Sequence, residues 1–276
     1  MANFDINNFV IDRVVRGVAL SQKDDSVLFS INQMQNVSLN CASESTDAVD
    51  ALGTPIATFY RAKSAEFSAE NALFDMNLMA TQLGTKKEIG SADNKIVVPA
   101  MESFVVEVSK TKELKHTPIA REVEKADGSK VTEYISEIYE LNGDSTFGTK
   151  YTLATKAEGT NFAYVVETNT LSLPAELVGK EVFVMYEYES ENAVEVINSA
   201  TEFPVGCKFV MEVLGCDVCD QTNLIYAYVV FPNFKLSPDF DWSIATDGTH
   251  PFSGKAQQEY CDREKKLFNI IIPGDN

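Results

Sequence analysis

The stretch Thr54–Gly84, TPIATFYRAKSAEFSAENALFDMNLMATQLG, decides the fold that the sequence predicts: a strand, a short second strand and then a helix. Ser68 is a suitable N-cap, because its hydroxyl can accept a hydrogen bond from a free backbone N–H of the first turn. Gly84 is a suitable terminator at the other end. Apolar residues at helical spacing form one stripe: Ala69, Ala72, Leu73, Met76, Met79, Ala80 and Leu83. We therefore predict one helix over Ala69–Leu83 with a core-facing side.

Two large apolar residues, Phe74 and Leu78, lie on the opposite side of that predicted helix. A surface helix with a single covered face has no use for them. Two explanations stay open. A loop of the same chain covers them, or the helix lies between its own sheet and a neighbouring subunit, which makes both residues candidate interface residues.

A long hairpin is predicted just before the helix. Val27–Cys41 alternates apolar and polar residues, as a half-buried strand does, and Ile56–Ala62 is the returning strand. The segment Ser43–Gly53 is small and acidic and is expected to be a flexible loop at the tip. Because a two-stranded ribbon is marginal alone, we expect it to make contacts outside its own subunit. The candidate contact residues at the tip are Ser43, Asp47 and Asp50.

Short strands separated by turn residues fill the remainder of the chain. Clear examples are Ile135–Leu141, Val182–Tyr188, Cys207–Leu214 and Leu224–Phe231. Many short strands with regular turn signals favour an antiparallel sandwich or barrel over an α/β fold. The predicted fold is therefore mainly β, with one flanking helix and a long hairpin.

The charge balance argues against binding to nucleic acid. The 276 residues include 23 basic and 41 acidic side chains, a net charge of −18, and no third of the chain is basic. Such a surface repels phosphates, although acidity also simply keeps a protein soluble. No apolar run is long enough to span a bilayer, and the N-terminus has no signal-peptide core. We expect a soluble protein, folded in a cytoplasm, with no membrane partner.

Residue chemistry gives no sign of an enzyme, a metal site or a cofactor site. There is no phosphate-binding glycine loop and no GxSxG motif. Cys216 and Cys219 form a CxxC pair, but a zinc ribbon needs a second pair, so the five cysteines are expected to be free thiols. The two histidines, His116 and His250, lie in polar segments and are expected to be bystanders. The single tryptophan, Trp242, is expected to plug a core.

The order of these features resembles the major tail tube proteins of long-tailed bacteriophages. The matching pieces are the ribbon (VLFSINQMQNVSLNC and TPIATFYRAKSAEFS), the helix (ENALFDMNLMATQLG) and a C-terminal block. That block comprises FPVGCKFVMEVLGCDVC, IYAYVVFPNFKLSPDFDWSI and HPFSGKAQQEYCDREKKLFNIII. The middle of the chain, at about 110–200, resembles a strand-rich insertion of larger phage structural proteins. The chain 1–276 would then be one tail-tube-like β domain that carries this insertion.

The resemblance implies a β-sandwich or half-barrel flanked by one helix. Six copies would form a ring whose inner strands join into a continuous barrel, and rings would stack into a virion tail tube. Genome DNA would pass through this acidic conduit without specific binding. The implied partners are the protein itself and other tail proteins, such as a sheath, a tape measure, and a baseplate or terminator protein. The resemblance implies no catalytic, metal or cofactor residues.

Two other functions are compatible with the residues. Another virion protein, such as a capsid or decoration subunit, is one, although a capsid protein usually has a long spine helix that this sequence lacks. A monomeric carbohydrate-binding or hydrolytic β-sandwich is the other, and it would need aromatic platforms or a carboxylate pair. Electron microscopy would separate the three, since it would show tubes or rings, shells, or no assemblies.

Overall fold

The computed structural model describes residues 9–124, 128–218, 220–259 and 264–273. These residues divide into two compact units. Unit 1 combines two segments, 1–87 and 196–276, and unit 2 is the continuous segment 88–195. The chain leaves unit 1 through β5 (Lys87–Ile89) and returns through β15 (Val194–Val196), and these two short strands pair with each other.

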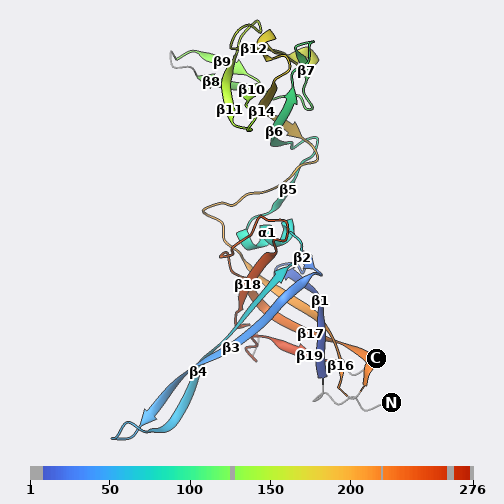
Figure 1. The fold of residues 1–276 in the computed structure, drawn as a ribbon. Coiled ribbons are helices and arrows are strands. Elements are labelled where there is room, and N and C mark those ends of the chain that lie inside the picture. The colour runs from blue at the N-terminus through green and yellow to red at the C-terminus, as the bar shows by residue number, and fades with distance from the viewer. Residues whose placement is uncertain (1–8, 125–127, 219, 260–263, 274–276) are drawn as a thin grey trace. The chain divides into compact units, whose positions relative to one another are not determined.

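Unit 1 is built on a single antiparallel sheet whose strand order is β2-β1-β16-β17-β18-β4-β3, with β19 also pairing with β17. Its strands are β1 (Phe9–Ser21), β2 (Val27–Ile31), β3 (Met34–Val49), β4 (Pro55–Asn71), β16 (Gly206–Asp217), β17 (Asp220–Leu236), β18 (His250–Ala256) and β19 (Asn269–Ile271). The strands at the two ends of this order, β2 and β3, are joined by only Asn32 and Gln33. The ends must therefore lie close together, which rolls the sheet into a half-barrel (Figure 1).

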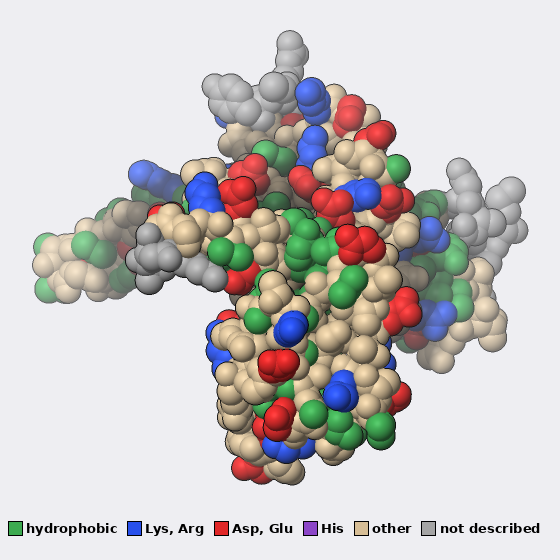
Figure 2. All heavy atoms as spheres, turned by 90° about the horizontal axis from the view of Figure 1, so that it is seen from above, with side chains coloured by type: hydrophobic (Ala, Val, Ile, Leu, Met, Phe, Trp, Pro, Cys, Tyr) green, Lys and Arg blue, Asp and Glu red, His purple; other side chains and the backbone are tan. Residues whose placement is uncertain are grey.

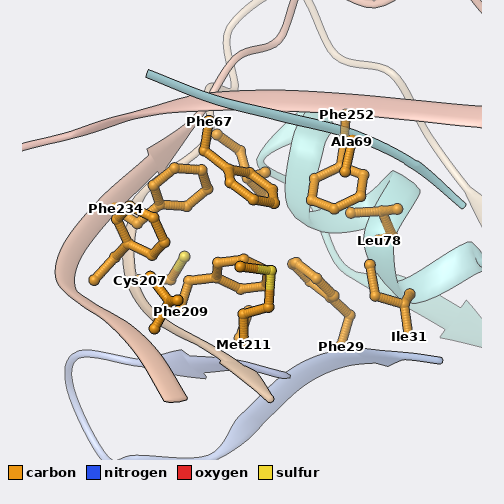
Figure 3. Close-up of a cluster of buried hydrophobic side chains, with 14 of the residues drawn as sticks. Phe29, Ile31, Phe67, Ala69, Leu78, Cys207, Phe209, Met211, Phe234 and Phe252 are labelled. Atoms are coloured by element: carbon orange, nitrogen blue, oxygen red, sulfur yellow. The ribbon is translucent and has the colours of Figure 1, made fainter. Parts of the chain in front are cut away.

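The interior of the half-barrel is filled mainly by phenylalanine. The ring of Phe67 lies 5.4 Å from that of Phe209, 5.8 Å from those of Phe231 and Phe252, and 6.0 Å from that of Phe234. Figure 3 shows Phe67, Phe209, Phe234 and Phe252 converging from strands that are far apart in the sequence. Because a buried aromatic side chain removes a large apolar area from water, this cluster is the main source of stability in unit 1.

The predicted helix Ala69–Leu83 is wrong at its start. The structure places the only α-helix among the described residues, α1, at Met76–Leu83, and Ala69 lies on β4 opposite Phe252 of β18. The N-cap is Asp75, whose carboxylate accepts from the N–H groups of residues 77 and 78 at 2.9 and 2.7 Å. Gly84 ends the helix as predicted, with φ 76°.

The predicted hairpin exists but has different bounds. Val27–Cys41 is interrupted after Ile31, where the chain passes from β2 at one end of the sheet to β3 at the other. The predicted loop Ser43–Gly53 is wrong, because β3 continues to Val49 and pairs with β4 along its length, so that the connecting turn is only residues 50–54. The ribbon is therefore longer than the sequence indicated, and it projects beyond the other strands of unit 1 (Figure 1).

Unit 2 contains a second, seven-stranded sheet of order β6-β14-β10-β11-β12-β13-β7 and a separate β8–β9 hairpin. The strands are β6 (Ile96–Val105), β7 (Thr111–Glu113), β8 (Arg121–Glu124), β9 (Lys130–Glu133), β10 (Ile135–Leu141), β11 (Phe147–Leu153), β12 (Asn161–Val165), β13 (Thr170–Ser172) and β14 (Glu181–Ser190). Its core centres on Val182, Val184 and Tyr186 of β14. The two units thus have separate hydrophobic cores.

One buried carboxylate organises the polar part of the core of unit 2. Glu102 on β6 accepts a hydrogen bond from the Tyr186 hydroxyl at 2.5 Å and another from the backbone N–H of Lys115 at 3.0 Å. The Tyr186 oxygen in turn accepts from the N–H of His116 at 3.1 Å. Burial, followed by the hydrogen bond to Glu102, raises the pKa of Tyr186 well above its ordinary value. This network ties the segment after β7 to the sheet.

Candidate assembly surface

The outer part of the β3–β4 ribbon packs on nothing else in the described chain. Every residue from 41 to 64 is exposed except Ala48, which is half-buried. We call residues 44–61 the distal ribbon. It carries five large exposed apolar side chains, with Leu52 in the turn 91% exposed and Phe59 54% exposed; the others are Val49, Ile56 and Tyr60. A segment this apolar and this exposed is typical of a surface that another molecule covers.

The distal ribbon is apolar on both of its faces. Phe59 lies opposite Thr46 on the neighbouring strand, and Tyr60 lies opposite Ser45. Successive residues of a strand point to opposite sides of a sheet, so these two aromatic rings are on opposite faces. A ribbon of this kind has no single face to lay against its own subunit. Both faces of the distal ribbon thus carry exposed aromatic side chains.

A β-bulge separates the distal ribbon from its base. Ala42 pairs with Ser64 and Glu44 pairs with Arg61, so that Ser43 lies opposite two residues, Ala62 and Lys63. Ala62 has φ 50°, a left-handed conformation that non-glycine residues adopt uncommonly. A bulge adds local twist and bends the strand that carries it. It therefore sets the direction in which the distal ribbon leaves the half-barrel.

Below the bulge the ribbon is anchored in the core. Ala65, Phe67 and Ala69 alternate with exposed or half-buried residues, and all three are buried. Phe67 is 1% exposed and sits within the phenylalanine cluster. The same strand thus has a rigid base and a free outer part, joined at the bulge.

The structure places the predicted contact residues at different points of this surface. Ser43 lies at the bulge and Asp47 is exposed on the distal ribbon. Asp50 shapes the turn, because its Oδ1 accepts from the N–H groups of residues 52 and 54, both at 2.9 Å. Leu78 is 0% exposed and belongs to the core of its own chain, where it lies beside Ile31 (Figure 3). Its side chain is therefore covered within its own chain, and Phe74 precedes the helix and is not part of it.

Phe74 precedes the helix and is part of an aromatic stack. Its ring lies 4.6 Å from that of Trp242, at an interplanar angle of 14°, and 5.3 Å from that of His250. The expectation that Trp242 plugs a core is wrong, since its side chain is 36% exposed and covers the outer side of Phe74. Phe74 itself stays 44% exposed, so this stack forms a second apolar surface on unit 1.

His250 is a structural residue that the sequence did not reveal. It is buried, its Nδ1 accepts from the N–H of Asp75 at 3.4 Å, and its Nε2 lies 2.8 Å from Oε1 of Gln82. Because Nδ1 is an acceptor, Nε2 carries the proton and donates to Gln82. Burial lowers the pKa of His250 below 6.5, and the nearby charge of Asp75 offsets part of that effect. A neutral imidazole therefore joins the two ends of α1.

The cysteines of the described residues are free thiols. Cys41 is exposed, Cys216 is half-buried on β16, and Cys207 is buried, which raises the pKa of its thiol to about 12. Cys219 of the CxxC pair and Cys261 lie outside the described residues. Within the described residues, no group of three or more His, Cys, Asp or Glu side chains is placed to hold a metal ion.

The negative charge is unevenly divided between the units. Unit 2 has 20 acidic and 10 basic residues, and unit 1 has the remaining 21 acidic and 13 basic residues. On the face in Figure 2, acidic side chains are scattered among basic and apolar ones. Of the helices that the structure describes, none has the length and apolar character needed to cross a membrane.

Comparison with known proteins assigns the chain to a family. A search of curated proteins finds no match. The model of the YomU/Tube protein family matches residues 9–266, which covers the segments that form both units. The resemblance to tail tube proteins is thereby confirmed. The chain belongs to the YomU/Tube protein family and is, on that membership, a structural protein of a phage tail tube.

Proposed function

We propose that the protein forms rings of six copies that stack into the tail tube, and that the tube is an acidic conduit for the genome at ejection. The ring number and the passage of DNA come from the resemblance to tail tube proteins. In this proposal the half-barrel of unit 1 supplies the strands that join into the barrel of the ring. Unit 2 is the strand-rich insertion, and it is not needed to close that barrel. The protein acts by assembly and not by catalysis.

The observation that carries the proposal is the distal ribbon. It exposes aromatic side chains on both faces, Phe59 on one and Tyr60 on the other, and its base is fixed in the core by Phe67. Covering a large apolar side chain stabilises an assembly by about 1.5–3 kcal/mol. A monomer gains nothing from a rigid exposed ribbon of this kind, whereas a stacked assembly can bury both faces at once.

The acidic conduit is supported by charge. A wall of Lys and Arg would hold a polyanion through counterion release, whereas a weakly acidic wall offers no such trapping sites. The alternative, that acidity only keeps unassembled subunits apart, requires no acids on the lumen. Replacing lumen acids with Lys should slow ejection without affecting assembly. Tight, salt-sensitive binding of the purified protein to duplex DNA would rule out the conduit.

The tail position also defines the other proposed partners. A tape measure protein would lie inside the lumen, a sheath would surround the tube in a contractile tail, and a baseplate or terminator protein would meet its ends. The exposed stack of Phe74 and Trp242 is a proposed contact between neighbouring copies within a ring. Changing Phe74 to Asp would test this contact, because burial of an unpaired carboxylate costs several kcal/mol.

Electron microscopy of the purified protein tests the proposal. We expect rings or tubes for the wild type. The double variant Phe59→Ser with Tyr60→Ser should stay folded and lose them. A matched control is Val108→Ser, which removes a strongly exposed apolar side chain from unit 2. Closed shells would favour a capsid protein, and monomers at every concentration would favour a binding module. Normal tubes from the double variant would show that the distal ribbon does not carry assembly.

A further inference from the structure

A pocket of about 620 Å³ lies at the root of the distal ribbon. We call it the root pocket. Its walls come from residues 62–66 of β4, from the end of β18, and from the segment that leads into β19. The apolar lining includes Ala65, Leu267 and Phe268, and the bulge residue Ala62 forms part of the rim.

The root pocket is basic in a chain that is strongly acidic overall. Three lysines line it, Lys63, Lys255 and Lys265, against a single acid, Glu66. Lys255 is paired with Glu66 at 2.8 Å. Lys63 and Lys265 make no ion pair with any residue that the structure describes. Two positive charges are thus left beside an apolar surface, which is an arrangement suited to an acidic and partly apolar segment.

We propose that the root pocket receives the tip of the distal ribbon of a second copy of this chain, an inference that rests on the proposed stacking of the protein. Residues 45–60 contain two charged side chains, Asp47 and Asp50, and both are acidic. Between and beyond them lie exposed apolar residues, of which Leu52 in the turn is the most exposed. The tip therefore complements the pocket, because the two carry opposite charge and both expose apolar side chains.

The tip of the same chain cannot occupy this pocket. Ser64 in the pocket wall lies twelve positions after Leu52 in the turn, which corresponds to about 40 Å along a strand. The ladder between β3 and β4 holds the ribbon extended over that distance. Tip and pocket are thus complementary surfaces at opposite ends of one rigid element. Contacts between two different surfaces of identical chains are head-to-tail, and when they do not close into a ring they add copies without limit. A tube grows in that way.

Charge reversal tests the contact, because both partners are present in every copy. The root variant is Lys63→Glu with Lys265→Glu. The tip variant is Asp47→Lys with Asp50→Asn, in which the amide oxygen of Asn can still accept the two hydrogen bonds of the turn. We expect each variant alone to raise the protein concentration needed for tubes by about tenfold or more, because like charges meet at the contact. A one-to-one mixture of the two variants should restore tubes, since each tip then meets a pocket of opposite charge.

Controls separate this contact from the proposed function. Lys23→Glu with Lys86→Glu makes the same change in net charge elsewhere in unit 1, and it should assemble as the wild type does. Circular dichroism and sedimentation establish that each variant is folded. Variants that assemble normally would overturn the tip-to-root contact, as would a mixture that fails to restore tubes while both variants are folded. Absence of tubes from the wild type would instead refute the proposed function itself.

Discussion

The division of β4 into a core anchor and a free outer part predicts opposite outcomes for two phenylalanines on one strand. Phe67→Ala should destabilise unit 1 by about 3–5 kcal/mol, the usual cost of truncating a buried aromatic side chain. We expect the upper half of that range, because the four neighbouring rings come from β16, β17 and β18 and are fixed by the sheet, so the cavity cannot collapse. Phe59→Ala should change the free energy of unfolding by less than about 0.5 kcal/mol.

The single tryptophan makes the measurement specific to unit 1. Trp242 belongs to that unit and stacks on Phe74, so its fluorescence reports the unfolding of unit 1 and not of unit 2. With a urea dependence of about 2 kcal/mol per molar, a loss of about 4 kcal/mol lowers the unfolding midpoint by about 2 M. The reasoning fails if Phe67→Ala moves the midpoint by less than about 0.5 M, or if Phe59→Ala moves it as far.

Three further predictions follow from local geometry. Gly84→Ala should destabilise unit 1 by more than about 1 kcal/mol, because Gly84 has φ 76° and a new Cβ there would lie 2.2 Å from the backbone of Phe203. Urea unfolding measures this loss of stability. The contribution of neutral His250 to the stability of unit 1 should be fully present above pH 6.5 and should fall as the pH drops below 6.5, because the unfolded chain then protonates this histidine more readily than the folded chain does. His250→Gln should remove that part of the pH dependence of the free energy of unfolding. An unchanged pH profile in the variant would contradict the assignment. Glu102→Ala should cost unit 2 about 1–3 kcal/mol by leaving the buried Tyr186 hydroxyl without its acceptor, and calorimetry should show a lowered transition for that unit.

The sequence predicted strands well where alternation was strong and uninterrupted. Ile135–Leu141 has the same bounds as β10, and Cys207–Leu214 lies within β16. The prediction was wrong at the start of the helix because the apolar residues of 65–71 fit both the spacing of a helix and the alternation of a strand. Ala69 continues the helical stripe of Leu73 and Met76, but it also continues the alternation of Ala65 and Phe67. Pairing with β18, which is nearly two hundred residues away in the chain, decides between them.

The ribbon tip and the helix partners were missed for a different reason. Residues 43–49 are small, polar and acidic, so composition indicates a loop, yet the backbone ladder with β4 holds them in a strand without any buried side chain. Such a strand has no signal of its own in the sequence. The role of His250 was likewise hidden, because its partners, Asp75 and Gln82, are brought to it only by the fold.

The distribution of charge bears on how an acidic conduit would work. Unit 2 has an excess of ten acids and unit 1 an excess of eight. Within the sheet of unit 1, Glu66 is paired with Lys255 at 2.8 Å and Glu212 with Arg16 at 2.7 Å, so these two acids do not contribute to that excess. Because ten of the eighteen excess acids lie on unit 2, a barrel made from the strands of unit 1 would repel DNA more weakly than the net charge of the chain suggests. Weak repulsion still meets the physical requirement, since fast passage depends on the absence of a continuous basic wall and not on a strongly negative one. Solubility of the free subunit can then depend mainly on unit 2, where the acidic excess is larger and the barrel strands take no part.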